Sequence, residues 1–134
     1  MFDTYVFQVW PRPGAIVSVP IFLGFHHKGI VSDRWYRGKP MVISASARTR
    51  EVREEPWDTF TGGRDVTVER NPEFLEGMRI VYRARSRIGT PYDLFAFNCE
   101  HLVSYSLGRQ PQSPQLAVTA LVLVVGLIAL GARG

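Results

Sequence analysis

The chain has 134 residues, of which 46% are hydrophobic, and this composition suits a single domain with a real core. Its formal net charge is +4, but acidic residues are interspersed among the basic ones and no nucleic-acid motif is present, so we expect a solvated charged face with a weak attraction to anionic lipid rather than a nucleic-acid partner. A single cysteine excludes a disulfide within the chain and fits a reducing compartment.

Residues 1–12 read as a lead-in that lacks the basic start and apolar centre of a signal peptide. Runs rich in apolar and β-branched residues then predict strands at 15–19, 25–31, 41–46 and 65–69. A polar turn through Asp33, Arg34 and Gly38 joins the second strand to the third.

Two helices are predicted after these strands. The first begins at Asn71-Pro72-Glu73, with a capping residue, a proline and an acid, and ends at Gly89. Its expected apolar stripe consists of Leu75, Met78, Val81 or Tyr82, and Ile88. The second helix begins at Cys99 and ends at Leu107-Gly108, with Asn98 as its N-cap.

Cys99 is the most informative residue of the chain. At the first turn of a helix, free backbone N–H groups and the helix dipole would surround its sulfur and favour the thiolate, the nucleophilic form of cysteine. The alternative is a buried cysteine that only packs, which is common for this residue type.

The segment Asn98-Cys99-Glu100-His101-Leu102-Val103 resembles the signature of the lecithin:retinol acyltransferase family, in the NlpC-type papain-like superfamily, with Leu102 in place of the usual Phe. Further similar stretches occur in the order known from bacterial members: 13–17, 26–31, 41–44, 60–63 and 113–115. The resemblance implies an α+β fold of circularly permuted papain-like type, in which a small antiparallel sheet packs with helices.

The resemblance also implies the site residues. Cys99 would be the nucleophile and His27 the general base, and Ser44 stands where the family has a second histidine. A hydroxyl can accept a hydrogen bond from imidazole, although Ser46, two residues on, could take the role instead, or both could be ordinary strand serines. The Cys99 backbone N–H is the expected oxyanion donor, supported by Asn98. Tyr92 is either a further donor or a core residue.

The other two histidines, His26 and His101, are weaker candidates for a catalytic role. His101 lies two residues after Cys99, and such positions point about 200° apart on a helix, so we expect it to cap or pack. His26 and His27 point to opposite faces of a strand, so only one of them faces the cysteine. No cluster with ligand spacing accompanies them, so we expect neither a metal nor a cofactor.

The C-terminal segment Leu116–Ala132 has no charge and one polar residue, Thr119. Seventeen helical residues rise about 25 Å, slightly less than a hydrocarbon core of about 30 Å. A helix that is apolar all round must be buried in protein or in lipid, and we favour the membrane over core packing. The expected organisation is a lead-in (1–12), a catalytic domain (13–110), a hinge (111–115) and a membrane-anchoring or transmembrane helix (116–132).

Together these features predict a membrane-anchored cysteine acyltransferase or phospholipase-like hydrolase that acts on phospholipid or other acyl esters through a thioacyl-enzyme, with its catalytic domain on the cytoplasmic side. Two alternatives stay open. One is an NlpC-type cysteine amidase or peptidase with the same nucleophile. The other is a non-catalytic membrane adaptor, which is suggested by Ser44 in place of the second histidine of the family.

Overall fold

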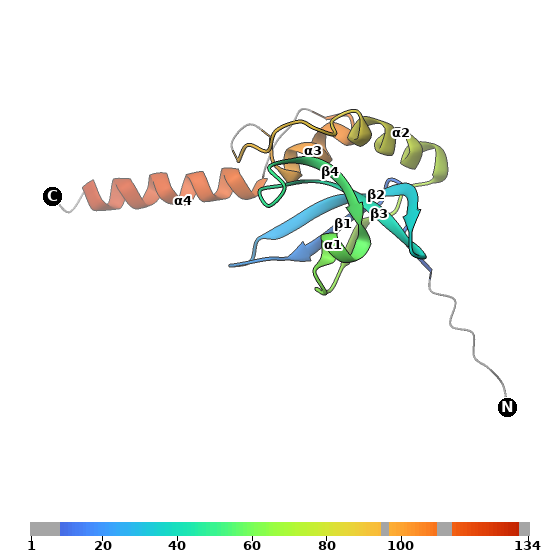
Figure 1. The fold of residues 1–134 in the computed structure, drawn as a ribbon. Helices are drawn as coiled ribbons and strands as arrows, with labels where there is room; N and C mark the ends of the chain where they lie inside the picture. Colours follow the sequence, from blue (N-terminus) through green and yellow to red (C-terminus); the bar gives the residue numbers. More distant parts are fainter. Residues whose placement is uncertain (1–8, 95–96, 110–113, 132–134) are drawn as a thin grey trace.

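A computed structural model of the chain describes residues 9–94, 97–109 and 114–131. A five-stranded antiparallel sheet forms its centre, with strand order β4-β3-β2-β1-β5. Helices α2 and α3 cover one face of the sheet, and the short α1 packs against β3 and β4 (Figure 1). This arrangement confirms the predicted α+β class with a small antiparallel sheet.

The strands are β1 (Ile16–Pro20), β2 (His26–Tyr36), β3 (Lys39–Ser46), β4 (Glu51–Pro56) and β5 (Thr67–Arg70). The helices are α1 (Trp57–Thr61), α2 (Phe74–Arg85), α3 (Cys99–Ser106) and α4 (Pro114–Gly131). The lead-in predicted for 1–12 and the hinge predicted for 111–115 lie mostly outside the described residues.

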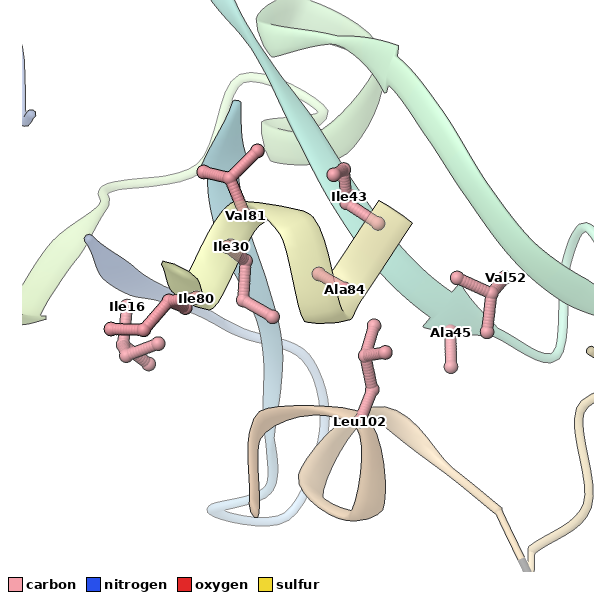
Figure 2. Close-up of a cluster of buried hydrophobic side chains, with 9 residues drawn as sticks. All are labelled: Ile16, Ile30, Ile43, Ala45, Val52, Ile80, Val81, Ala84 and Leu102. Atoms are coloured by element: carbon pink, nitrogen blue, oxygen red, sulfur yellow. The ribbon is translucent and has the colours of Figure 1, made fainter. Parts of the chain in front are cut away.

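Two apolar clusters lie on opposite faces of the sheet. On the helix face, α2 and α3 pack against the strands through Ile16, Ile30, Ile43, Ala45, Val52, Ile80, Val81, Ala84 and Leu102 (Figure 2). On the other face, Phe60 of α1 closes a cluster with Ala15, Val17, Val19, Val31 and Val42. Alternate residues of β2 and β3 therefore enter different cores, as the two-residue period of a strand requires.

The apolar stripe predicted for the first helix is confirmed at Val81, which is buried, and is wrong at Leu75 and Ile88, which are exposed. Leu75 and Tyr82 are exposed, while the buried residues of α2 are Gly77, Ile80, Val81 and Ala84. Small residues face the sheet because the helix approaches the chain closely: a Cβ on Gly77 would lie 2.1 Å from the carbonyl oxygen of Pro13. The helix also begins later than predicted, with Glu73 at its N-cap.

The sequence reading missed β4 and placed the β2–β3 turn too early. β4 carries mostly charged residues, and only Val52 is buried in the core. Those charges are paired rather than free: Glu54, for example, accepts a hydrogen bond of 3.0 Å from Arg85 of α2. Asp33 and Arg34 belong to β2, and the turn lies at Arg37-Gly38, both of which have positive φ angles.

Helix α4 follows α3 in the chain and projects from the sheet domain (Figure 1). It begins at Pro114, two residues before the predicted start. Within the described residues, no helix meets the combined length and hydropathy that crossing a membrane requires, so the predicted transmembrane helix is unconfirmed.

The buried face of α2 can be tested with two alanine substitutions on the same helix. Ile80→Ala should lower the free energy of unfolding by about 2–5 kcal/mol, because it opens a cavity beneath the sheet. Leu75→Ala should change it by less than about 0.5 kcal/mol, because that side chain is exposed. Urea denaturation in mild detergent measures both, and an equal loss would contradict the observed helix face.

Candidate active site

Cys99 is the first residue of α3, and a reciprocal cap fixes the start of that helix. The Asn98 side chain accepts hydrogen bonds from the backbone N–H groups of Glu100 (2.9 Å) and His101 (3.2 Å). In return, the Asn98 backbone N–H donates to Nδ1 of His101 at 2.9 Å. Asn98 is thus the predicted N-cap, and His101 is a capping residue, as expected from its spacing to the cysteine.

The Cys99 thiol is half-buried in the space beside β2. Burial raises the pKa of the thiol above its usual value, and the charge of Glu100 raises it further, while hydrogen bonding from the backbone of Lys28 and the Lys28 charge lower it. The direction is opposite to the one expected from a helix start alone, because the loss of solvent outweighs the nearby N–H donors. The resting cysteine is therefore a protonated thiol at neutral pH.

The sulfur lies where β2 and β3 separate. The paired register of these strands ends at Ile30 and Ile43, although β2 begins at His26 and β3 continues to Ser46. At this end of β2 the backbone has other partners. The His26 N–H donates to Oε1 of Gln115 (3.0 Å), and the backbone of Lys28 lies close enough to the Cys99 thiol to lower its pKa.

A hollow of about 290 Å³, here called the polar hollow, opens beside the separated strands and includes the thiol. Its charged and polar lining residues are His27, Ser46, Arg48, Glu55, Thr59, Arg64, Tyr92 and Cys99, with Phe60 against His27. The structure thus brings Cys99, His27 and Tyr92 to one space. Within the described residues, no hydrogen bond joins the His27 imidazole to the Cys99 thiol.

His27 reaches this hollow from an unexpected side of the sheet. Its ring lies 5.0 Å from the ring of Phe60, between centroids, on the face opposite the Leu102 core. His27 therefore faces the hollow that includes Cys99, but from the side of the sheet on which Phe60 packs. The histidine and the cysteine share a space because β2 and β3 part there, which opens a passage between the two faces.

The His27 imidazole is strongly held in its neutral form. Burial lowers its pKa to about 4, and the positive charges of Arg64 and Arg48 act in the same direction. Arg48 is paired with the Glu55 carboxylate at 2.6 Å. Within the described part of the chain, Arg64 has no carboxylate partner and donates to the Pro20 carbonyl at 3.2 Å.

The two candidate serines have different positions. Ser44 is buried in β3 and does not line the polar hollow, whereas Ser46 lines it next to His27 and Cys99. The Ser46 hydroxyl accepts a hydrogen bond from the Arg48 backbone N–H at 3.1 Å. His26 is exposed and borders a second hollow on the other side of Cys99.

Tyr92 lies close to the nucleophile. Burial raises its pKa, and the neighbouring Cys99 and Asp93 raise it further, which keeps the phenol protonated. A protonated phenol can donate a hydrogen bond. Within the described residues, no group of three or more His, Cys, Asp or Glu side chains could hold a metal ion.

Sequence reasoning missed the residues that join distant segments at the site. Glu100 is buried, 3.9 Å from the Lys28 ammonium, and it accepts a hydrogen bond of 3.0 Å from the Gln115 backbone N–H. The Gln115 side chain pairs with both the N–H and the carbonyl of His26. A glutamate inside the cysteine motif was the available signal for the first contact. The similar stretch 113–115 contains Gln115 but gave it no role, and no local pattern indicates Arg64.

The neutral His27 gives a direct prediction. NMR-monitored titration should place its midpoint near 4, and Arg64→Gln should raise that midpoint toward 6.5, whereas Arg109→Gln, outside the polar hollow, should not. Because the folded pKa lies below the unfolded value, the stability is complete above pH 6.5 and falls as the pH drops toward 4. The loss from this group is on the order of 3 kcal/mol. A His27 midpoint at or above 6.5 would contradict the burial described.

Comparison with known proteins identifies the family of the chain. The family model described as lecithin retinol acyltransferase matches residues 11–110, a range that contains His27, Tyr92 and Cys99. A search of curated proteins finds no match to this chain. Since the matched range covers most of the sequence, the chain belongs to the lecithin retinol acyltransferase family.

Proposed function

We propose that this protein is a cysteine acyltransferase or acyl-ester hydrolase that works through a thioacyl-enzyme on Cys99. The observation that carries the proposal is the shared hollow, in which a cysteine at a capped helix start meets a buried neutral histidine. Membership in the lecithin retinol acyltransferase family supports an activity of this class. The substrates are phospholipid or other acyl esters.

The reaction begins with the transfer of the thiol proton to His27 as the sulfur attacks the ester carbonyl carbon. The C–S bond forms, the ester C–O bond breaks, and the leaving alkoxide takes the proton from the His27 imidazolium. An alcohol, an amine or water then attacks the thioester and gives its proton to His27, which returns it to the departing sulfur. A neutral imidazole is the form that this general-base role requires.

Stabilisation of the oxyanion would come from the start of α3. The Asn98 side chain occupies the N–H groups of Glu100 and His101, and this leaves the Cys99 N–H to face a substrate oxygen. The Tyr92 hydroxyl, also in the polar hollow, is the second candidate donor. For the group that orients His27, Ser46 is better placed than Ser44, because only Ser46 lines the hollow.

Association with a membrane surface belongs to the same proposal. Seven apolar side chains of α4 are more than half exposed: Val118, Leu121, Val122, Leu123, Val125, Leu127 and Ile128. The hairpin tip between β1 and β2 adds Ile21, Phe22 and Leu23, which are also exposed. Figure 1 shows the hairpin and α4 projecting on the same side of the domain. Burial of both in a lipid interface would remove this apolar surface from water.

A non-catalytic membrane adaptor is the second candidate function. It is favoured by the raised pKa of Cys99 and by the missing hydrogen bond between this thiol and His27 in the described residues. Geometry in a substrate-free site often tightens only when substrate binds, so we place the enzyme first.

Catalysis can be tested by intact-mass analysis after incubation with phosphatidylcholine vesicles. The wild type should gain one acyl group on Cys99, and Cys99→Ala should gain none while it remains folded. His27→Ala should slow acylation by about 10²–10⁴-fold, whereas the exposed His26→Ala should retain most of the rate. Equal losses in the two histidine variants would refute the assignment of the base, and an unlabelled wild type would favour the adaptor.

Vesicle flotation tests the membrane surface. Leu121→Lys combined with Val125→Lys and Ile128→Lys should release the protein from phosphatidylcholine vesicles, because each exposed side chain would then bring a charge into the interface. These positions leave the Gln115 contacts with the domain intact. Arg109→Lys is the charge-neutral control. Full flotation of the triple variant would argue against α4 as the membrane contact.

A further inference from the structure

Cys99 borders a second hollow, which lies on the α4 side of the sulfur and is here called the acyl groove. Its apolar wall consists of Ile21 and Phe25 from the β1–β2 hairpin, Leu94, and the first turns of α4 at Gln115 and Thr119. Beside the sulfur it is also lined by polar residues: His26, Tyr92, Asn98 and Glu100. Its volume is about 290 Å³, close to the lower limit of roughly 300 Å³ for ligand pockets. Apolar surface exceeds polar surface in both hollows, and the excess is larger in the acyl groove.

The acyl groove continues away from the sulfur. A neighbouring hollow of about 340 Å³ shares Phe25, Gln115 and Thr119 with it and adds Leu23, Gly24 and Val118. The two spaces therefore form one apolar track between the hairpin tip and the first turns of α4. The outer end of the track lies beside exposed Leu23 and Val118, at the surface that is proposed to meet lipid.

The polar hollow is a poor place for a hydrocarbon chain. It is lined by the Arg48–Glu55 ion pair and by Arg64, which within the described residues has no carboxylate partner. Covering these charges with methylene groups would cost desolvation energy without any new hydrogen bond. On the acyl-groove side, each methylene removed from water contributes about 0.8 kcal/mol.

We infer that the acyl chain of the thioester on Cys99 lies in the acyl groove, between the β1–β2 hairpin and α4, while the alcohol part of the ester occupies the polar hollow. This inference rests on the proposed function and adds the direction in which the substrate lies across the sulfur. Phe25 and Thr119 become specificity-determining residues, since one lines each wall of the track. Helix α4 is then part of the substrate site as well as a membrane contact.

The test measures chain-length selectivity with the full chain in dodecyl maltoside micelles. p-Nitrophenyl acetate and p-nitrophenyl decanoate are the probes, and the burst of nitrophenol together with the intact mass gives the rate of Cys99 acylation. The wild type should prefer the decanoyl ester. Phe25→Asp, which puts a charge in the groove, and Thr119→Trp, which fills it, should each lower the decanoyl-to-acetyl rate ratio by about tenfold or more.

Phe74→Asp is the matched control, because Phe74 is an exposed phenylalanine of α2, away from the proposed lipid surface, and lines neither part of the track. Its rate ratio should stay within about twofold of the wild type. If Phe25→Asp does not fold, the result with Thr119→Trp is decisive, since the Thr119 hydroxyl donates within its own helix, to the Gln115 carbonyl.

The outcomes distinguish a failure of the acyl groove from a failure of the proposed thioacyl mechanism. A wild type without chain-length preference, or an unchanged ratio in folded Thr119→Trp, would overturn the acyl groove while the thioacyl mechanism stands. An equal drop in Phe74→Asp would also overturn it, because the effect would then not depend on the groove. If neither ester acylates Cys99, the proposed function fails and the inference fails with it.

Discussion

The site depends on the cap at the start of α3. The Asn98 side chain holds two backbone N–H groups, His101 holds the Asn98 N–H in return, and the Asn98 amide donates to the Leu94 carbonyl at 3.0 Å. One turn further on, Leu102 is fully buried in the core beneath α2. The cap fixes the start of α3, and the buried Leu102 fixes its packing against the core. The Cys99 sulfur therefore has little freedom to leave its position beside β2. Loss of such a cap costs about 1 kcal/mol of stability, but here it would also displace the nucleophile.

The separation of β2 from β3 is the second feature that makes chemistry possible. A fully paired sheet would close the space between its faces, and His27, on the Phe60 face, would not meet a cysteine that approaches from the α3 face. Burial in the resulting gap keeps both groups neutral, which is opposite to a resting thiolate–imidazolium pair. An anionic group bound near Arg64 would reduce the positive field on His27 and make it a stronger base.

The two hollows beside Cys99 differ in their charged residues: two arginines and a glutamate line one, while the other, which also contacts Glu100, has the larger excess of apolar surface. Arg48, Glu55 and Arg64 lie on one side, while Phe25, Leu94 and Thr119 lie on the other. Gln115 links the apolar side to the catalytic domain, because it bonds to the His26 backbone with its side chain and to the Glu100 carboxylate with its N–H. A lipid ester has the same division into a polar and an apolar part. The proposed orientation of the substrate follows from that match.

Much of the site could be predicted from the sequence because the patterns that indicate it are local. Asn98 before Cys99 predicts a capped helix start, and the three strands at 15–19, 25–31 and 41–46 follow from their apolar β-branched residues. Long-range packing decided the rest. β4 was missed because its charges are neutralised by partners such as Arg85 and Arg48, which are distant in sequence or separated by a turn. The stripe of α2 was misread because Gly77 and Ala84, rather than large residues, allow the helix to approach the sheet.

The sequence by itself determined which nucleophile begins α3. Only the tertiary structure decided that the Cys99 thiol is protonated and that His27 shares a hollow with it from the Phe60 face of the sheet. Burial and strand separation cause these two features, and both arise from contacts between segments that are far apart in the chain.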